Sequence, residues 1–351
     1  MTFACFCNTL DLLNARERVA IAFFTVKGSR KSSIYNTPET AKPNPTKSDK
    51  KDISMSAQAL SVPPSGPSIT IRRAKPEDAP VCGRVCFDAF YRISTGHGFP
   101  PDFPSPDVAV GLLSMMFSHP GFYCAVAESD GCLVGSSCLD ERSAIAGLGP
   151  ITVDPSVQDR GVGRKLMEAV LARARERNFP GVRLLQSAFH NRSLALYSRL
   201  GFDAREPVSV MQGPPLRKRI EGCSVRPARV SDVEDCKRLC MQVHGHDRAG
   251  ELADAMKGGT AVVVERHERI TGYATVLAFF GHAVAETNLD LQALIASAEG
   301  FAGPGIIVPT RNSDLFRWCL ENGLRVVQPM TLMTSGLYNE PAGAYLPSVL
   351  F

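Results

Sequence analysis

The chain has 351 residues, 44% of them hydrophobic, and its 39 Lys and Arg against 35 Asp and Glu give a formal net charge of +4. Nine of the basic and five of the acidic residues fall within residues 1–68, so this segment carries the whole surplus and the rest is close to neutral. This length and composition are typical of a globular protein with room for two hydrophobic cores. The near-neutral charge of residues 69–351 argues against nucleic-acid binding. No run of about 18 apolar residues is present, so a membrane span is not expected.

Residues 1–68 are predicted to form a disordered or targeting extension. Residues 37–67 are rich in Pro, Ser, Lys and Thr and poor in large apolar side chains. Residues 3–26 are weakly amphipathic, but Asp11 and Glu17 weaken an organelle-targeting interpretation. Met55 is also a sensible start of the chain, so the sequence does not determine whether the mature protein contains residues 1–54. Eleven cysteines without paired short spacings, and no clear secretion signal, predict reduced thiols, no disulfides and a cytoplasmic location.

A first domain is predicted over residues 69–215. It opens with ITIRRAKPED at residues 69–78, and two apolar strands around Ala127 and Gly135 are expected to form a hairpin.

The next segment, residues 151–164, reads ITVDPSVQDRGVGR and predicts a strand, a loop with two glycines and the start of a helix. The strand is indicated by the β-branched run at 151–153, and the helix by apolar residues recurring at 3.6-residue spacing from Val162 to Val170. Such a junction presents unpaired N–H groups at the positive end of a helix dipole, and Gly161 and Gly163 carry no Cβ to keep phosphate oxygens away. The segment is therefore a candidate pyrophosphate site.

A second apolar run at 181–188 leads into NRSLALYSRLGF at 191–202. The pattern Gln158-x-x-Gly161-x-Gly163, followed by Asn191, Tyr197 and a closing Gly-Phe pair, resembles the two coenzyme A motifs of the GNAT superfamily of N-acetyltransferases. The resemblance implies an α/β fold, with a mixed, mostly antiparallel central sheet flanked by helices, and acetyl-CoA as co-substrate without a metal.

The resemblance also implies roles for particular residues. The strand at 151–153 would splay from the next strand and bond the pantetheine arm, and a backbone N–H near Val153 would polarise the thioester carbonyl. Asn191 would bind the arm, although it is also a good helix N-cap, and the Tyr197 phenol would protonate the departing thiolate, although it is also a plausible packed helix residue. The implied catalytic residue is Tyr197, and the implied coenzyme-binding residues are Ile151, Thr152, Val153, Gln158, Asp159, Arg160, Gly161, Val162, Gly163, Arg164 and Asn191.

The base that takes a proton from the amine acceptor is not singled out by the sequence. Asp140, Glu141 and His190 are candidates by position, and each also suits a purely structural role. The loop at 99–107 is expected beside the acceptor side, where Asp102 and Asp107 would receive a cationic amine, or else it is a rigid surface loop.

The chain repeats itself after a linker at 216–222. CSVRPARVSD at 223–232 matches residues 69–78, a hairpin recurs around Val264 and Gly272, and the run from Asn312 mirrors that from Asn191, with Trp318 at the tyrosine position. No Gln-x-x-Gly-x-Gly lies between the second hairpin and residue 308. Residues 223–351 are therefore interpreted as a degenerate GNAT-like domain, unable to bind coenzyme A in the usual way, that covers a sheet edge and walls the acceptor pocket.

Cys236, Cys240, His244 and His246 have a spacing that also fits metal ligands. Their counterparts in the first copy, Cys82, Cys86 and Phe90, form an apolar helix face of the same phase, so a buried core role is predicted instead.

The sequence thus predicts an acyltransferase that moves an acetyl group from acetyl-CoA to a primary amine of a small molecule or peptide by direct attack. The alternative is a non-catalytic acetyl-CoA-binding sensor or scaffold, and a different acyl group is a third possibility because the loop reads the coenzyme. The amine acceptor is the expected partner, neither nucleic acid nor membrane is expected, and the oligomeric state is not indicated.

Overall fold

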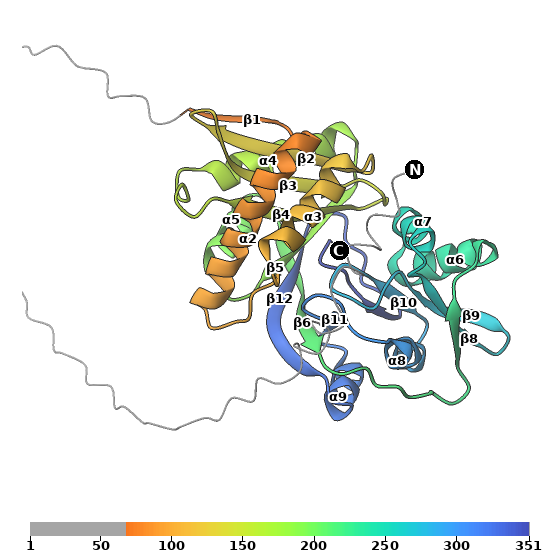
Figure 1. Ribbon diagram of the computed structural model, residues 1–351. Helices are drawn as coiled ribbons and strands as arrows, with labels where there is room; N and C mark the ends of the chain where they lie inside the picture. The colour runs from red at the N-terminus through yellow and green to blue at the C-terminus, as the bar shows by residue number, and fades with distance from the viewer. Residues whose placement is uncertain (1–67, 351) are drawn as a thin grey trace, which may run out of the picture. The chain divides into compact units, whose positions relative to one another are not determined.

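The structure is a computed structural model that describes residues 68–350 (Figure 1). The predicted extension therefore lies outside the described residues, apart from Ser68. Residues from Pro67 onward form one unit, in which helices pack on two sheets. The first half of this unit contains β1 (Ile69–Arg73), the short η1 (Pro76–Asp78), α2 (Ala79–Gly96), α3 (Pro106–Ser118), β2 (Phe122–Ser129), β3 (Cys132–Asp140), β4 (Ala146–Val153), α4 (Val162–Glu176), β5 (Gly181–Ser187), α5 (Asn191–Arg199) and β6 (Asp203–Gln212).

The second half repeats this order with shorter elements. It contains β7 (Ser224–Pro227), η2 (Val230–Asp232), α6 (Val233–His244), α7 (Ala249–Lys257), β8 (Val262–Arg266), β9 (Arg269–Ala274), β10 (Ala283–Ala285), α8 (Asn288–Ser297), β11 (Ile306–Pro309), α9 (Ser313–Glu321), β12 (Arg325–Gly336) and β13 (Ala344–Leu346).

The larger sheet has eight strands in the order β1-β2-β3-β4-β5-β12-β6-β11, and a five-stranded sheet has the order β13-β10-β9-β8-β7. All neighbours in both sheets are antiparallel except β4 and β5. The predicted fold class, a mixed and mostly antiparallel sheet flanked by helices, is confirmed. Both predicted hairpins are also present, as β2–β3 and β8–β9.

Strand alternation divides the core of the first half into two layers. Along β2, Cys124 and Val126 belong to the apolar cluster under α2 and α3, whereas Ala125 and Ala127 belong to the cluster under α4 and α5. Helix α4 contributes a buried stripe at the spacing predicted from the sequence, including Val162, Leu166 and Val170. The sheet is therefore covered on both faces.

Strands β4 and β5 pair only at their first residues. Ala146 lies opposite Val182 and Gly147 opposite Arg183, and beyond these two positions no further pairing occurs between the strands. The remaining parts of β4 and β5 diverge, so the sheet opens between them near the α4 N-terminus.

Strand β12, from the second half, lies between β5 and β6 of the first half, and β6 in turn lies between β12 and β11. The β6–β12 register is symmetric about the pair Val208–Met330, because a constant offset of 122 residues relates the positions in the two strands. The mirrored pairs are Ser209–Pro329 with Pro207–Thr331, and Met211–Val326 with Ala204–Met333. The two halves thus exchange equivalent strands around an internal two-fold axis.

The offset of 122 corrects one sequence alignment. Helices α5 (191–199) and α9 (313–321) have the same offset, which places Cys319, not Trp318, at the position of Tyr197. Cys319 is fully buried in the core of the second half, so this position carries no phenol.

The prediction that no disulfide forms is wrong for one pair. Cys124 and Cys138 form a disulfide, because they face each other directly in the β2–β3 register although 14 residues separate them in the chain. Sequence spacing does not reveal such a cross-strand pair.

Residues Cys236 and Cys240 are buried among Leu239, Val243 and other apolar side chains, as the repeat predicted. His244 and His246 are buried as well. Within residues 68–350, no group of three or more His, Cys, Asp or Glu side chains is placed to hold a metal ion. None of the helices in this range is long and apolar enough to cross a membrane.

Candidate active site

The loop between β4 and α4 is built around short local contacts. Asp154 Oδ1 accepts hydrogen bonds from the Ser156 N–H (2.8 Å) and hydroxyl (2.7 Å), and Gln158 Nε2 donates to the Val153 carbonyl (3.2 Å). Gly161 has φ 80°, which a residue with a side chain rarely adopts, and it forms the N-cap of α4. The loop reverses the chain so that α4 starts beside the end of β4.

The N-terminus of α4 lacks a side-chain cap. The first N–H groups of a helix have no partner within it, and they carry the positive end of its dipole. A Cβ on Gly163 would make only ordinary contacts, 3.6 Å from Val153 and 3.8 Å from Leu196, and one on Gly161 would meet nothing within 4 Å. The junction therefore leaves room and donors for an anion, which fits the pyrophosphate of coenzyme A.

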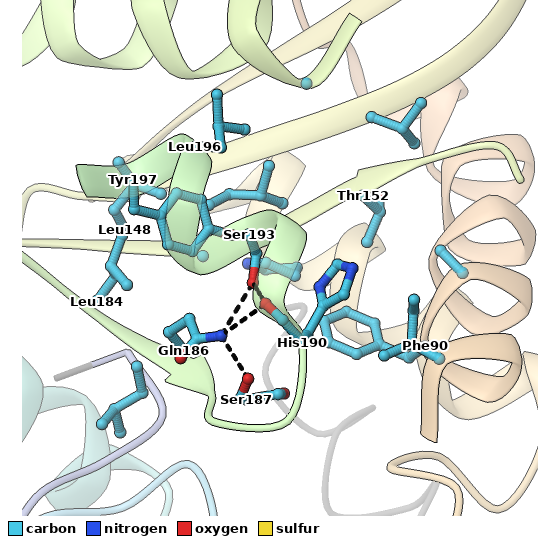
Figure 2. A pocket seen from close by; sticks show the side chains of 18 of the residues that line it. Phe90, Leu148, Thr152, Leu184, Gln186, Ser187, His190, Ser193, Leu196 and Tyr197 are labelled. Atoms are coloured by element: carbon cyan, nitrogen blue, oxygen red, sulfur yellow. Dashed lines mark hydrogen bonds between the residues drawn. The ribbon is translucent and has the colours of Figure 1, made fainter. Parts of the chain in front are cut away.

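A cavity of about 550 Å³, called the splay cavity below, begins at this junction and passes between the diverging parts of β4 and β5. In Figure 2, Leu148, Leu184, Leu196 and Tyr197 surround one side of it, whereas Phe90, Thr152 and His190 surround the other. The predicted site residues that line the cavity are Ile151, Thr152, Val153, Gln158, Asp159, Gly161, Val162, Gly163, Arg164 and Tyr197.

The two other predicted residues do not line it. Arg160 and Asn191 are both exposed. The suggested N-cap role of Asn191 is wrong, because His190 is the N-cap residue of α5, Asn191 is its first helical residue, and no side chain caps this helix. By contrast, Asn312 in the second half does cap α9, accepting a hydrogen bond from the Leu315 N–H at 3.4 Å.

Tyr197 lies on the face of α5 that packs toward α4 and the sheet, and its ring contacts that of Phe202 at 6.3 Å between centroids. Burial raises the pKa of Tyr197, so the phenol stays protonated at neutral pH. Its side chain also lines the splay cavity. A packed residue and a proton donor are therefore compatible roles for Tyr197.

Arg192 is a site residue that the sequence did not single out. It lies at the start of α5, lines the cavity, pairs with Asp159 and also reaches Gln158 Oε1 at 3.5 Å. It thereby connects α5 to the loop and adds positive charge beside the α4 N-terminus. The only signal for Arg192 in the sequence is its position next to Asn191, and an arginine beside a motif residue is common on protein surfaces.

Gln186 holds the turn between β5 and α5. Its Nε2 donates to the His190 carbonyl (3.0 Å), the Ser193 hydroxyl (3.1 Å) and the Ser187 carbonyl, as Figure 2 shows. Because Gln186 is only 2% exposed, these contacts are shielded from water and fix the position of His190.

The structure distinguishes the three candidate bases by their partners and by whether they line the cavity. Asp140 binds Arg142 (2.9 Å), Glu141 binds Arg173 (2.7 Å), and neither carboxylate lines the cavity. His190 does line it, and burial, together with Arg192 and His97, lowers the pKa of its imidazole. His190 is therefore held in its neutral form, which can accept a proton.

The loop at 99–107 also divides into two parts. Asp102 lines the splay cavity, together with Phe103, whereas Asp107 is exposed in the first turn of α3. Phe99 stacks on Phe189 at 4.2 Å between centroids, which attaches this loop to the segment preceding α5.

The described part of the second half has no counterpart of the open junction between β4 and α4. Strand β10 passes into α8 through only Glu286 and Thr287, and Thr287 forms a reciprocal capping box with Asp290. At the start of α8, the Asp290 carboxylate thus accepts hydrogen bonds from the Thr287 N–H and hydroxyl, so a carboxylate of the protein itself lies at this helix N-terminus.

Comparison with known proteins agrees with this geometry. Residues 88–202 match the acetyltransferase (GNAT) family model. An uncharacterized N-acetyltransferase of Escherichia coli, YjgM, is 29% identical over 142 residues, which cover 39% of this chain and 83% of that protein.

Solved structures show the same fold over both halves. A Pyrococcus horikoshii protein assigned to the acetyltransferases has a TM-score of 0.62 at 21% identity, covering 82% of this chain and 97% of that chain. A GCN5-related N-acetyltransferase from Sphaerobacter thermophilus has a TM-score of 0.52 at 16% identity, covering 78% and 96%. Residues 88–202, which contain the uncapped start of α4, Tyr197 and most of the residues that line the splay cavity, thus match the GNAT family of acetyltransferases.

Proposed function

We propose that this protein transfers the acetyl group of acetyl-CoA to a primary amine of a small molecule or peptide by direct attack. The observation that carries the proposal is a single cavity that joins the uncapped N-terminus of α4 to Tyr197 and His190. Acetyl-CoA supplies the activated acetyl group, and its pyrophosphate would lie against residues 158–164.

The residues of the cavity suggest how the transfer proceeds. The unpaired parts of β4 and β5 would bond the amides of the pantetheine arm, with an N–H near Val153 directed at the thioester carbonyl. Neutral His190 would take a proton from the ammonium group, directly or through water, so that the amine can attack. A C–N bond then forms, the C–S bond breaks, and Tyr197 would protonate the thiolate. The proton that the nitrogen loses as it becomes an amide would return through water to the Tyr197 phenolate.

The proposal is tested by calorimetric titration with acetyl-CoA, followed by thiol-release assays against a panel of amines. We expect one binding site for each chain and thiol release with at least one amine. Binding without release from any amine would favour the sensor alternative, and no binding would refute the coenzyme site.

A substitution at the junction sharpens this test. Gly163→Trp places an indole where the pyrophosphate would lie, and its Cβ is sterically tolerated, so the affinity for acetyl-CoA should fall at least about a hundredfold. Gly111→Trp is the matched control, because Gly111 is also a helical glycine with open space around its Cβ, and it does not line the cavity. Equal affinities of the two variants would refute the proposed pyrophosphate site.

A further inference from the structure

The part of the splay cavity that faces α2, α3 and the second half, called the acceptor chamber below, is almost entirely apolar. Val349 packs against both the apolar cluster under α2 and α3 and the cluster around Phe279 and Met330, so these walls are continuous. The side chains that matter most here are Phe90, Ile93, Phe103, Phe279, Met330 and Leu350. Among the described residues that α2, α3, the loop between them and the second half contribute to this chamber, Asp102 is the one ionisable group, and His190 lies on the same side of the cavity as Phe90.

Asp102 is held in place by two buried partners. The Ser94 hydroxyl donates to Oδ2 at 3.1 Å, and Gln328 Nε2 donates to Oδ1 at 2.8 Å. Both partners are almost fully buried, at 1% and 2% exposure. Each carboxylate oxygen therefore has one fixed donor and retains capacity to accept a hydrogen bond from a ligand in the chamber.

The charge of Asp102 is not matched by a cation of the described part of the protein, because no Lys, Arg or His there forms an ion pair with it. Burial raises the pKa of Asp102, and the hydrogen bonds from Gln328 and Ser94 only partly oppose this effect. A carboxylate in apolar surroundings is costly unless a cation compensates it. A ligand that brings a cation would provide that compensation.

We propose that the acceptor is a primary amine on an apolar, aromatic or branched aliphatic body, with its ammonium group paired to Asp102 and its body buried in the acceptor chamber. This inference rests on the proposed acetyl transfer and names its substrate class. A free amine and the N-terminus of a peptide with an apolar first residue share this chemistry.

The chamber also indicates which amines are excluded. A polyamine would bury a second ammonium group against Phe279, Met330 and Leu350, and an amino alcohol would bury a hydroxyl there, in both cases without a polar partner. An apolar body of the same size instead gains the free energy of leaving water. The single carboxylate therefore selects for one cationic group at one end of the ligand.

The second half of the chain supplies much of this selectivity. Gln328 and Met330 come from the exchanged strand β12, Phe279 from the segment after β9, and Leu350 from the C-terminal segment. The Val349 N–H donates to the Phe279 carbonyl at 2.9 Å, which connects the last two of these segments. The half without a pyrophosphate loop would thus determine the acceptor.

The test uses the full chain with acetyl-CoA and compares thiol release for 2-phenylethylamine and 3-methylbutylamine with that for ethanolamine and spermidine. The two apolar amines should have kcat/KM values at least about 30-fold higher, the factor expected from burying one large apolar group. A dipeptide with an N-terminal Phe is tested beside the free amines to distinguish a peptide acceptor from a free amine, and a dipeptide with an N-terminal Ser is its control.

Asp102→Asn tests the ion pair directly. It should raise the KM for 2-phenylethylamine at least about 30-fold, while the calorimetric affinity for acetyl-CoA stays unchanged. Asp107→Asn is the matched control, because Asp107 lies in the same segment but is exposed and outside the cavity. If Asp102 served folding alone, Asp102→Asn would lower the melting temperature without this change in KM. If the variant does not fold, the amine preference of the wild type still tests the inference.

The outcomes separate this inference from the proposed function. Efficient acetylation of ethanolamine or spermidine in preference to the apolar amines would overturn the inference and leave acetyl transfer intact. Acetyl-CoA binding with no transfer to any amine would overturn both. Faster transfer from octanoyl-CoA than from acetyl-CoA would show that the chamber holds an acyl chain, which also overturns the inference.

Discussion

Tyr197 and His190 occupy one cavity, and burial affects their pKa values in opposite directions. Burial raises the pKa of the Tyr197 phenol, and burial, together with Arg192 and His97, lowers that of the His190 imidazole. At neutral pH one side chain therefore holds a proton to donate, and the other is free to accept one. This separation is what direct attack by an amine and departure of a thiolate require.

Tyr197→Phe tests the donor. The substitution keeps the packing against Phe202 and removes only the hydroxyl, so turnover should fall about a hundredfold with little change in affinity for acetyl-CoA. Tyr91→Phe, at an exposed tyrosine of α2 outside the cavity, is the control. Full activity of Tyr197→Phe would eliminate the proposed role.

The pH dependence of kcat tests the acceptor of the proton. In the proposed mechanism the neutral form of His190 is the active one, so the rate should fall as the pH decreases through a pKa below the ordinary value of 6.5. His190→Gln should lower the rate and remove this acidic limb. If the limb persists in the variant, another group takes the proton.

At the scale of the elements, β12 is the strand on which the first half depends. It pairs with β5 from Met330 to Gly336 and with β6 along most of its length, so its removal would expose two strand edges in the middle of a sheet. The repeat in the sequence predicts two domains with a linker at 216–222, but an exchanged strand has no signal in a local pattern.

A chain that ends after Gly222 tests this dependence. Although it contains every residue of the pyrophosphate loop and Tyr197, we expect it to be insoluble, because β5 and β6 lose their common partner. Soluble expression and circular dichroism, compared with a chain that starts at residue 68 and keeps the second half, are the measurements. A soluble, monomeric truncation that binds acetyl-CoA would show that the exchanged strand is dispensable.

At the scale of the whole molecule, a buried polar network joins the two halves. Ser143 of the first half donates to Glu251 Oε1 at 3.1 Å, and Glu251 also binds Arg248 at 2.7 Å and His282 at 3.2 Å. Tyr273 shares a hydrogen bond of 3.1 Å with the other ring nitrogen of His282. Burial favours a raised pKa for Glu251, but Arg248 and His282 outweigh it and hold the pKa of that carboxyl well below 4.5.

This network predicts a loss of stability in mild acid. Burial, together with Arg248, lowers the pKa of His282 to about 4, so the unfolded chain binds more protons than the folded one between about pH 6.5 and 4. The contribution of His282 to the free energy of unfolding is therefore fully present above the pKa that it has in the unfolded chain. This contribution declines as the pH falls through the window, by on the order of 3 kcal/mol at most. Denaturant unfolding of the wild type and of His282→Gln at several pH values in this window gives the free energy of unfolding as a function of pH. This free energy should depend less steeply on pH in the variant, and an equal pH dependence would exclude His282 as the cause.

The sequence by itself determined the features that depend on neighbouring residues. The glycines at 161 and 163 specify a loop and an open helix start, apolar periodicity specifies α4, and the repeated segments specify two halves of one fold. The GNAT resemblance followed from these local motifs, and the cavity contains most of the residues they named.

Only the tertiary structure decided which distant residues meet. It paired Cys124 with Cys138, brought β12 between β5 and β6, and placed Gln328 against Asp102, 226 residues away. Such contacts form because strands bury their edges and apolar faces wherever a complementary surface is available, and that choice depends on the whole molecule. The candidate coenzyme site therefore follows from short motifs, whereas the proposed acceptor chamber exists only once the two halves have exchanged their strands.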